Sequence, residues 1–293
     1  MSGGAVFPDP HPLAEAYPEA ATLLSHDLAG HELFTRGALR ALAGRMRPDT
    51  ISCCSGDVPV GVGPGGAPET GRSAQETIDT IERCGAWVVL KYVEQDPLYR
   101  ALLDGLLAEI EPWVRPRTAA MLQREAFIFL SSPGAVTPFH FDPEHNILMQ
   151  IAGRKTMNVL PFGERITPGP AHERFHAEGR NGLEWRDELA DCGRSFALAP
   201  GDALYVPVKA PHWVQNGEEV SISFSITWRS GWSLRENYAH GFNHILRRAG
   251  LNPRPPRRFP QDNHPKALAF QCIRKARSLI GAERFEACVA TTD

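Results

Sequence analysis

The chain has 293 residues, 42% of them hydrophobic, and a formal net charge of −3. This length suits one large domain, alone or with a helical appendage, and it supplies enough apolar side chains for a buried core. The 26 glycines and 25 prolines favour a turn-rich chain over a helical bundle. The nearly balanced charge favours neither nucleic acid nor a membrane as the main partner. Because no apolar run approaches about 18 residues and the first residues do not resemble a signal peptide, we expect a cytoplasmic protein.

Residues 1–85 are expected to form an N-terminal α/β lead to the main domain. Leu39, Leu42 and Met46 have helical spacing within 36–46, and Cys53-Cys54 is interpreted as part of a buried strand in preference to a redox pair. The Gly/Pro-rich stretch 58–73 is typical of a surface loop. A strand over 86–93 and a helix over 98–110, closed by Pro112, follow.

From residue 126 the pattern changes to short strands separated by turn sequences. The predicted strands are 126–131, 136–142, 146–151, 156–162, 195–199, 203–208 and 220–228. The last run alternates strictly between apolar residues and Ser or Thr, which predicts a half-buried strand. Many short strands with regular turns indicate a sandwich or barrel, so we expect a mainly β domain over 86–232.

The segment 233–293 returns to helical spacing and carries two apolar stripes. They consist of Leu234, Tyr238, Phe242, Ile245 and Leu246, and of Ala269, Cys272, Ile273, Ala276 and Ile280, the second widened by Leu268 and Leu279. The two helices could cover the barrel or pair with a second copy of the chain. We expect a homodimer.

The informative segment for chemistry is 137–162. His140 and Asp142 stand two apart in an extended run, so both side chains lie on one face of a strand. His212, after a strand and a Pro-containing turn, offers a third ligand. Two imidazoles and one carboxylate are the ligand set of non-haem Fe(II) oxygenases, which leave positions open for cosubstrate and O₂. The pairs His172/His176 and His240/His244 also have i,i+4 spacing, but neither has an evident third ligand.

This segment resembles the JmjC and cupin-like Fe(II)/2-oxoglutarate oxygenases, and among them the hypoxia-inducible-factor asparaginyl hydroxylases. The resemblance covers roughly 126–228. The matching positions are Thr137, Pro138, His140, Asp142, Asn146, Gly153 and Lys155, with His212 as the third ligand. It implies a double-stranded β-helix barrel flanked by helices, an iron site, and a 2-oxoglutarate pocket lined by Thr137, Asn146, Lys155 and Trp228. Ile226 departs from the asparagine that the hydroxylases have there.

Lys155 also fits this role on physical grounds. A 2-oxoglutarate bound through its keto-acid end projects a second carboxylate into the barrel, and a buried charge needs a partner. A hairpin across the turn at 152–154 brings Lys155 alongside the preceding strand, and the Thr137 hydroxyl can donate a second hydrogen bond. Lys91 and Tyr92, in a region of weaker similarity, are candidates for the mouth of the pocket.

The sequence therefore predicts an Fe(II)- and 2-oxoglutarate-dependent hydroxylase that uses O₂ and acts on a protein side chain or a small molecule. The alternative is a non-catalytic metal-binding cupin that serves as a sensor or binding module. Lys155 separates the two, because a cupin that does not use 2-oxoglutarate has no need of a buried lysine facing the metal. A DNA-binding regulator that uses the C-terminal arginines has little support, since no helix-turn-helix or zinc motif accompanies them.

Overall fold

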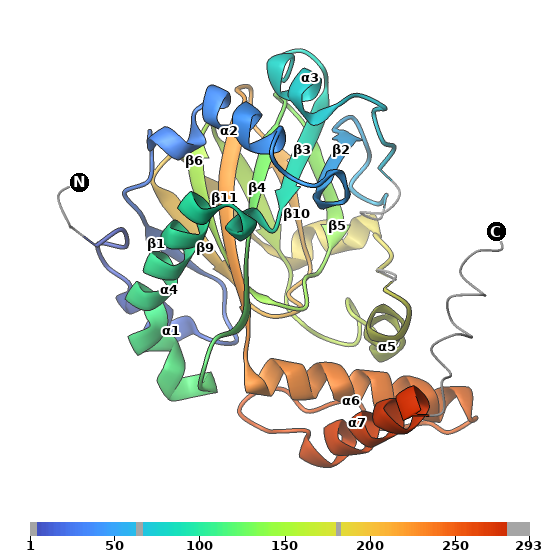
Figure 1. Ribbon diagram of the computed structural model, residues 1–293. Coiled ribbons are helices and arrows are strands. Elements are labelled where there is room, and N and C mark those ends of the chain that lie inside the picture. The colour runs from blue at the N-terminus through green and yellow to red at the C-terminus, as the bar shows by residue number, and fades with distance from the viewer. Residues whose placement is uncertain (1–4, 63–66, 180–182, 280–293) are drawn as a thin grey trace.

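A computed structural model of the chain describes residues 5–62, 67–179 and 183–279 (Figure 1). The strands are β1 Thr22–Ser25, β2 Ile51–Ser55, β3 Ala86–Lys91, β4 Leu122–Ser131, β5 Val136–His140, β6 His145–Ala152, β7 Lys155–Val159, β8 Arg194–Leu198, β9 Asp202–Val206, β10 His212–Asn216 and β11 Ser221–Arg229. The helices are α1 His11–Ala16, α2 Arg36–Ala43, α3 Ala74–Asp79, α4 Pro97–Thr118, α5 Gly169–Glu178, α6 Gly231–Arg248 and α7 His264–Leu279.

The strands form two antiparallel sheets that face each other. The large sheet has the order β1-β9-β6-β11-β4-β3-β2, and the small sheet has the order β5-β10-β7-β8. Leu148 and Leu204 of the large sheet pack against Met157 and Val214 of the small sheet, and this contact defines the barrel interior. The predicted mainly β, cupin-like barrel with flanking helices is confirmed.

The outer face of the large sheet carries the main hydrophobic core. Ile128, Phe224 and Trp228 of the sheet belong to one cluster with Leu106 and Ile110 of α4. Figure 1 shows α1, α2 and α4 arranged along this side of the sheet. The amphipathic helices therefore cover one face of the sheet and leave the opposite face for the barrel interior.

Helix α4 is longer than the sequence indicated. Pro112 was expected to end it, but the helix continues through Pro112 and Pro116 to Thr118. A proline inside a helix costs about 3 kcal/mol, because it removes one backbone hydrogen bond and crowds the preceding turn. Ile110 and Val114, which flank Pro112, are both fully buried, so tertiary packing offsets that cost.

Strand β11 is buried on both faces, whereas its alternating sequence predicted exposure of one face. Ser221, Ser223, Ser225 and Thr227 are all at most 4% exposed, since they face the barrel interior. There the Ser225 hydroxyl donates to Asn146 Oδ1 at 2.7 Å, and the Ser223 hydroxyl donates to Gln150 Oε1 at 2.7 Å. The polar face therefore belongs to an enclosed polar interior and not to the protein surface.

The N-terminal lead contributes strands to both edges of the large sheet. β1 pairs with β9, and β2 pairs with β3, so the expected buried strand at Cys53-Cys54 is present, with Cys54 buried. Strands β1 and β10 were not predicted. The 58–73 loop is only partly described, because residues 63–66 lie outside the described ranges.

The C-terminal helices pack on each other below the barrel in the view of Figure 1. The Phe270 ring of α7 approaches Tyr238 at 6.0 Å between centroids and lies directly against Gly241. The apolar stripe of α6 is half-buried, while Leu268 on α7 is 63% exposed. Ile280, from the second stripe, lies outside the described residues.

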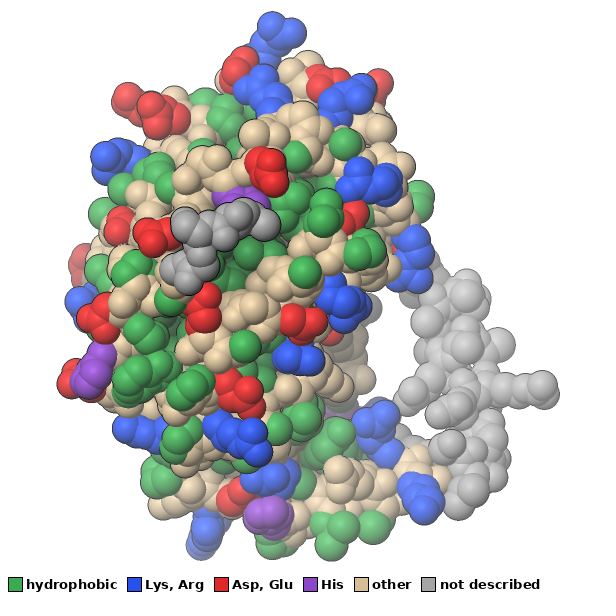
Figure 2. Space-filling model, turned by 60° about the vertical axis from the view of Figure 1, so that its left-hand side comes forward, with side chains coloured by type: hydrophobic (Ala, Val, Ile, Leu, Met, Phe, Trp, Pro, Cys, Tyr) green, Lys and Arg blue, Asp and Glu red, His purple; other side chains and the backbone are tan. Residues whose placement is uncertain are grey.

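The surface has a mixed charge. On the face turned forward in Figure 2, acidic and basic side chains are interspersed. Three arginines of the C-terminal segment 233–293 form ion pairs within the chain: Arg235 with Asp262, Arg247 with Glu173 and Arg258 with Glu19. This pairing reduces the basic charge that a nucleic acid could contact. Within the described part of the chain, no helix is both long and apolar enough to cross a membrane.

The turn between β6 and β7 generates a prediction about stability. Gly153 has φ +67°, and an added Cβ would lie 2.3 Å from the Val220 carbonyl oxygen. Gly134 has φ +70°, with nothing within 4 Å of its added Cβ. We expect Gly134→Ala to cost about 1 kcal/mol from backbone strain alone, and Gly153→Ala to cost at least about 2 kcal/mol because backbone atoms must also move. Urea unfolding measures both variants, and equal losses would contradict the role of the close approach.

Candidate metal centre

The register of the small sheet brings two predicted ligands together. His140 ends β5 and His212 begins β10, and the two are direct cross-strand partners with ring centroids 4.2 Å apart. Asp142 lies just beyond β5, with its carboxylate oxygens 3.9 Å from His140 Nε2 and 3.6 Å from His212 Nε2. Among the described residues, these three form the one group of His, Cys, Asp or Glu side chains whose ligand atoms all lie within 4.8 Å of one another.

Backbone carbonyl groups orient both imidazoles. His140 Nδ1 lies 2.7 Å from the Pro138 carbonyl oxygen, and His212 Nδ1 lies 2.9 Å from the Ala210 carbonyl oxygen. Because a carbonyl oxygen only accepts, each Nδ1 carries the proton in these hydrogen bonds. Each Nε2 then presents its lone pair toward Asp142, as a metal ligand must.

The electrostatics of the group suit a divalent cation. Burial, with a smaller contribution from the nearby His140, lowers the pKa of His212 to about 4, although Asp142 opposes the shift. At neutral pH this imidazole is therefore unprotonated and able to bind a metal ion. The Asp142 side chain is 37% exposed, so the group opens toward solvent on that side. Two imidazoles, one carboxylate and an open side fit an Fe(II) ion with free coordination positions.

Lys155, the first residue of β7, lies on the inner face of the small sheet. It is 6% exposed, and its ammonium group makes no hydrogen bond or ion pair with any described residue. Burial lowers its pKa to about 7. Its cross-strand neighbour Asn216, which the sequence did not suggest, also has a buried Oδ1 without a partner. Unpaired buried polar groups are costly, so the Lys155 ammonium marks a place where a ligand with an anionic group fits, whereas the Asn216 oxygen would need a hydrogen-bond donor.

Thr137 reaches the same interior through a β-bulge. It stands opposite Val214, which faces the barrel interior, while His140 stands opposite His212. Between these two pairs, β5 advances by three residues and β10 by only two, so β5 carries one extra residue there as a β-bulge. The bulge explains how residues of different strand parity, Thr137 and His140, can both face inward.

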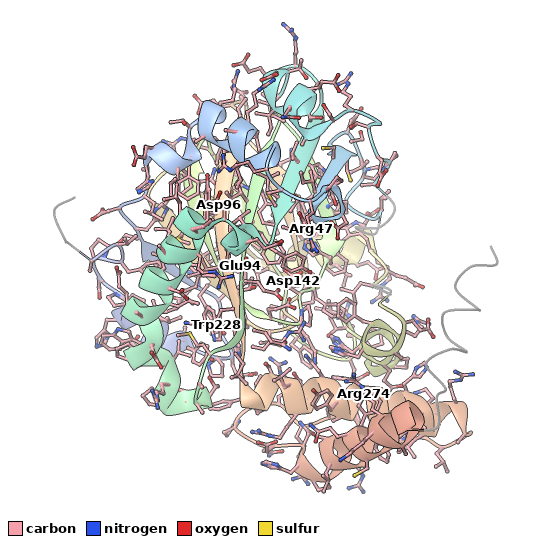
Figure 3. The ribbon with its side chains drawn as sticks, viewed as in Figure 1. Arg47, Glu94, Asp96, Asp142, Trp228 and Arg274 are labelled. Carbon is pink, nitrogen blue, oxygen red and sulfur yellow. The ribbon has the colours of Figure 1, made fainter. Side chains whose placement is uncertain are left out.

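Asn146 and Trp228 point to opposite faces of the large sheet. Asn146 lies opposite Thr227, whereas Trp228 lies opposite His145 and is fully buried in the main core. The Trp228 ring stacks on His145 at 5.3 Å and on Tyr17 at 6.2 Å. In the view of Figure 3, Trp228 is displaced from Asp142 toward α4. The expected place of Trp228 in the pocket with Asn146 is therefore corrected, because its strand parity turns it toward the helices.

Tyr92 lies near three acidic side chains, Glu94, Glu125 and Glu144, which together are called the acidic rim. Its ring packs on Phe127 at 5.4 Å, its side chain is partly exposed, and burial together with Glu125, Glu144 and Glu94 raises its pKa. Lys91, at the end of β3, lies opposite Phe127 and is half-buried.

The acidic residues of this rim were missed by sequence reasoning. Glu144 contacts Arg229 and has its pKa raised to about 7 by burial, while Arg229 opposes that shift and Asp142 adds to it. The position of Glu144, two residues after Asp142, was the available signal.

The histidines with i,i+4 spacing also meet in the structure. α5 and α6 place His172 and His176 beside His240, with ring centroids 5.0 and 5.6 Å from that of His240. Their buried ring nitrogens lack hydrogen-bond partners among the described residues, but they do not converge as closely as those of the triad. The structure therefore gathers these rings without forming a second set of metal ligands.

Part of the chain is similar to known JmjC domains. Residues 109–234 match the JmjC domain. Jumonji C domain-containing protein 5 of Drosophila melanogaster is 31% identical over 109 residues, which cover 34% of this chain and 26% of that protein. Lysine-specific demethylase JMJ31 of Arabidopsis thaliana is 25% identical over 173 residues, which cover 55% of this chain and 28% of that protein. The matched stretches thus span about a quarter of each relative's length.

The fold has solved counterparts. The structure of YcfD from Escherichia coli covers 88% of this chain, and the match covers 65% of that protein, with a TM-score of 0.50 and 16% identity. A second YcfD structure, described as a ribosomal oxygenase in complex with cobalt and 2-oxoglutarate, covers 89% of this chain and 64% of that protein, with a TM-score of 0.50 and 18% identity. At these identities the structures show a shared fold. Residues 109–234 are thus similar to JmjC domains, and the chain shares its fold with the YcfD structures.

Proposed function

We propose that this protein is an Fe(II)- and 2-oxoglutarate-dependent oxygenase that hydroxylates a C–H bond and releases succinate and CO₂. The observation that carries the proposal is the combination of two features in one barrel. One is the convergent His140, Asp142 and His212 group, and the other is the buried, unpaired Lys155 on the inner face of the same small sheet. A metal-binding cupin without a 2-oxoglutarate function would gain nothing from such a lysine, since an unpaired buried charge only destabilises the fold.

Each residue of the proposed site has a distinct task. His140, Asp142 and His212 would hold the metal ion, with the Nδ1 hydrogen bonds fixing both rings. The ion would supply the redox chemistry that couples O₂ to 2-oxoglutarate and substrate. The Lys155 ammonium would pair with the distal carboxylate of 2-oxoglutarate, and the Thr137 hydroxyl would donate a second hydrogen bond to it. Asn146 would line the interior beside Ser225.

The substrate belongs to the proposal as well. YcfD is described as a ribosomal oxygenase, and several relatives are named lysine-specific demethylases. A protein side chain is therefore our favoured substrate over a small molecule. Lys91 and Tyr92, beside the acidic rim, would be first to meet it at the pocket mouth. A cytoplasmic location accords with the free state of the five described cysteines.

We also propose that the protein forms a homodimer through its C-terminal helices. The half-buried stripe of α6 and the exposed Leu268 of α7 support this. An exposed apolar group at the end of a two-helix layer gains from burial against a second copy.

The first prediction concerns the metal ligands. We expect Asp142→Ala to bind Co(II), used as a probe for Fe(II), at least roughly 100-fold more weakly, because loss of a ligand exceeds the 10–100-fold effect of outer partners. Succinate formation with Fe(II), 2-oxoglutarate and candidate peptides should cease, while the melting temperature stays close to the wild-type value. Asp49→Ala, at an aspartate whose side chain is 69% exposed, is the control. Turnover of Asp142→Ala at the wild-type rate would refute the assignment.

The second prediction separates binding from stability at Lys155. Lys155→Met should weaken 2-oxoglutarate binding by roughly two to four decades, corresponding to about 3–5 kcal/mol for one broken buried charge pair. The same change should stabilise the ligand-free protein, because it removes a buried unpaired ammonium. The pKa of Lys155 is about 7 when folded, below its ordinary 10.5, so the unfolded chain binds more protons between these values. The gain should therefore be full below about pH 7 and disappear toward pH 10.5.

Calorimetry and denaturant unfolding across this pH range measure both effects of Lys155→Met. An unchanged 2-oxoglutarate dissociation constant would mean that the lysine has no part in binding.

The third prediction tests the dimer. Light scattering should give twice the chain mass for the wild type at micromolar concentration and a monomer for Leu268→Glu, because a charge at an apolar contact opposes association. Leu98→Glu changes a leucine of similar exposure, 61%, on α4 and should stay dimeric. A wild-type protein that is monomeric under these conditions would exclude the dimer.

A further inference from the structure

The loop between β9 and β10 touches both the aspartate and the second histidine of the triad. The Lys209 backbone N–H donates to the Asp142 carbonyl oxygen at 2.8 Å. The next carbonyl group, that of Ala210, accepts the hydrogen bond from His212 Nδ1. Lys209 also has φ +61°, a left-handed conformation that a side chain rarely adopts. This short loop therefore holds two ligands at once, in a conformation that other contacts must stabilise.

The side chain of Lys209 supplies such a contact. It is fully buried, and its Nζ lies 3.0 Å from Oε2 of Glu236 on α6, which is also fully buried. The other oxygen of Glu236 lies 3.2 Å from an Nη of Arg258, and Arg258 pairs in turn with Glu19 at 3.1 Å. A chain of alternating charges thus connects the ligand loop to α6, to the segment before α7 and to the N-terminal lead.

The geometry points to Glu236 as a positioning residue for the metal centre. Through Lys209 it fixes the loop that supports Asp142 and His212, so α6 takes part in forming the site although it contributes no ligand. This inference rests on the proposed function. A hydrophobic contact could hold α6 against the barrel, but the directional ammonium–carboxylate pair constrains the position of Lys209 more narrowly, in addition to its backbone hydrogen bond to Asp142.

Glu236→Gln tests this role with Co(II) alone as the probe. Removing the carboxylate charge leaves the Lys209 ammonium without its full counter-charge, so the loop can relax. We expect Co(II) affinity to fall roughly tenfold or more, within the range seen for residues that orient metal ligands, and the d–d absorption bands to change with the coordination geometry. Succinate formation should fall as well.

Glu173→Gln is the matched control. Glu173 is a buried carboxylate that pairs with Arg247 of the same α6, so this variant also loses a buried charge between two helices. It should lower the melting temperature and leave Co(II) affinity and spectrum unchanged. An equal fall in Co(II) affinity in both variants would assign the effect to general loosening of α6 and overturn the positioning role.

The double variant Lys209→Met/Glu236→Met keeps the test decisive if Glu236→Gln fails to fold. Replacing both charges by apolar groups avoids an unpaired buried charge, so the melting temperature should recover. Methionine contacts are flexible and non-directional, so Co(II) affinity should remain at least roughly tenfold weaker. Recovery of both properties would show a merely structural pair and overturn the inference. Failure of the wild type to bind Co(II) would instead overturn the metal site itself, and with it this inference.

Discussion

The pairing of β5 with β10 is the constraint on which the proposed site depends. It sets His140 directly opposite His212, although the two are 72 positions apart in the sequence. The bulge in the same pairing turns Thr137 inward, and the extension of β10 along β7 carries the register on to Lys155. A slip of one residue would turn His212 outward and exchange it for Trp213, since strand side chains alternate between faces. One antiparallel register thus determines both the proposed metal centre and the position of Lys155.

The large sheet divides the molecule into two different environments. Its outer face is apolar and packs under α1, α2 and α4, and that burial provides most of the hydrophobic stabilisation. Its inner face carries serines, Asn146 and Gln150, which bond to one another inside the barrel. A polar interior of this kind is tolerable when its groups are paired, and the groups left unpaired, Lys155 and Asn216, are those that would meet a ligand.

The N-terminal lead and the segment after α6 meet in one chain of ion pairs. Glu19 comes before β1 and Arg258 comes after α6, yet both belong to the ion-pair chain that ends at Lys209. The buried face of α6 is correspondingly polar, with Glu236, Asn237 and His240 inward and the apolar stripe at its side. Helical periodicity alone would have turned the apolar stripe inward. The barrel end instead presents the buried ammonium group of Lys209, and a buried charge requires a partner, which is the Glu236 carboxylate of α6.

The sequence by itself determined the mainly β class, the candidate ligands and most of the strands, though not β1 or β10. Alternation, turn residues and the two-residue spacing of His140 and Asp142 are local properties, and local properties can be read from the sequence. The tertiary structure alone decided which face of each strand points inward. It turned Trp228 into the helix-covered core, buried the serine face of β11, and carried α4 through two prolines because the packing of Ile110 and Val114 offset their cost. The tertiary structure also places Glu94, Glu125 and Glu144 near Tyr92 and pairs Glu236 with Lys209. Such contacts between distant segments depend on sheet register and helix docking, which no short stretch of sequence encodes.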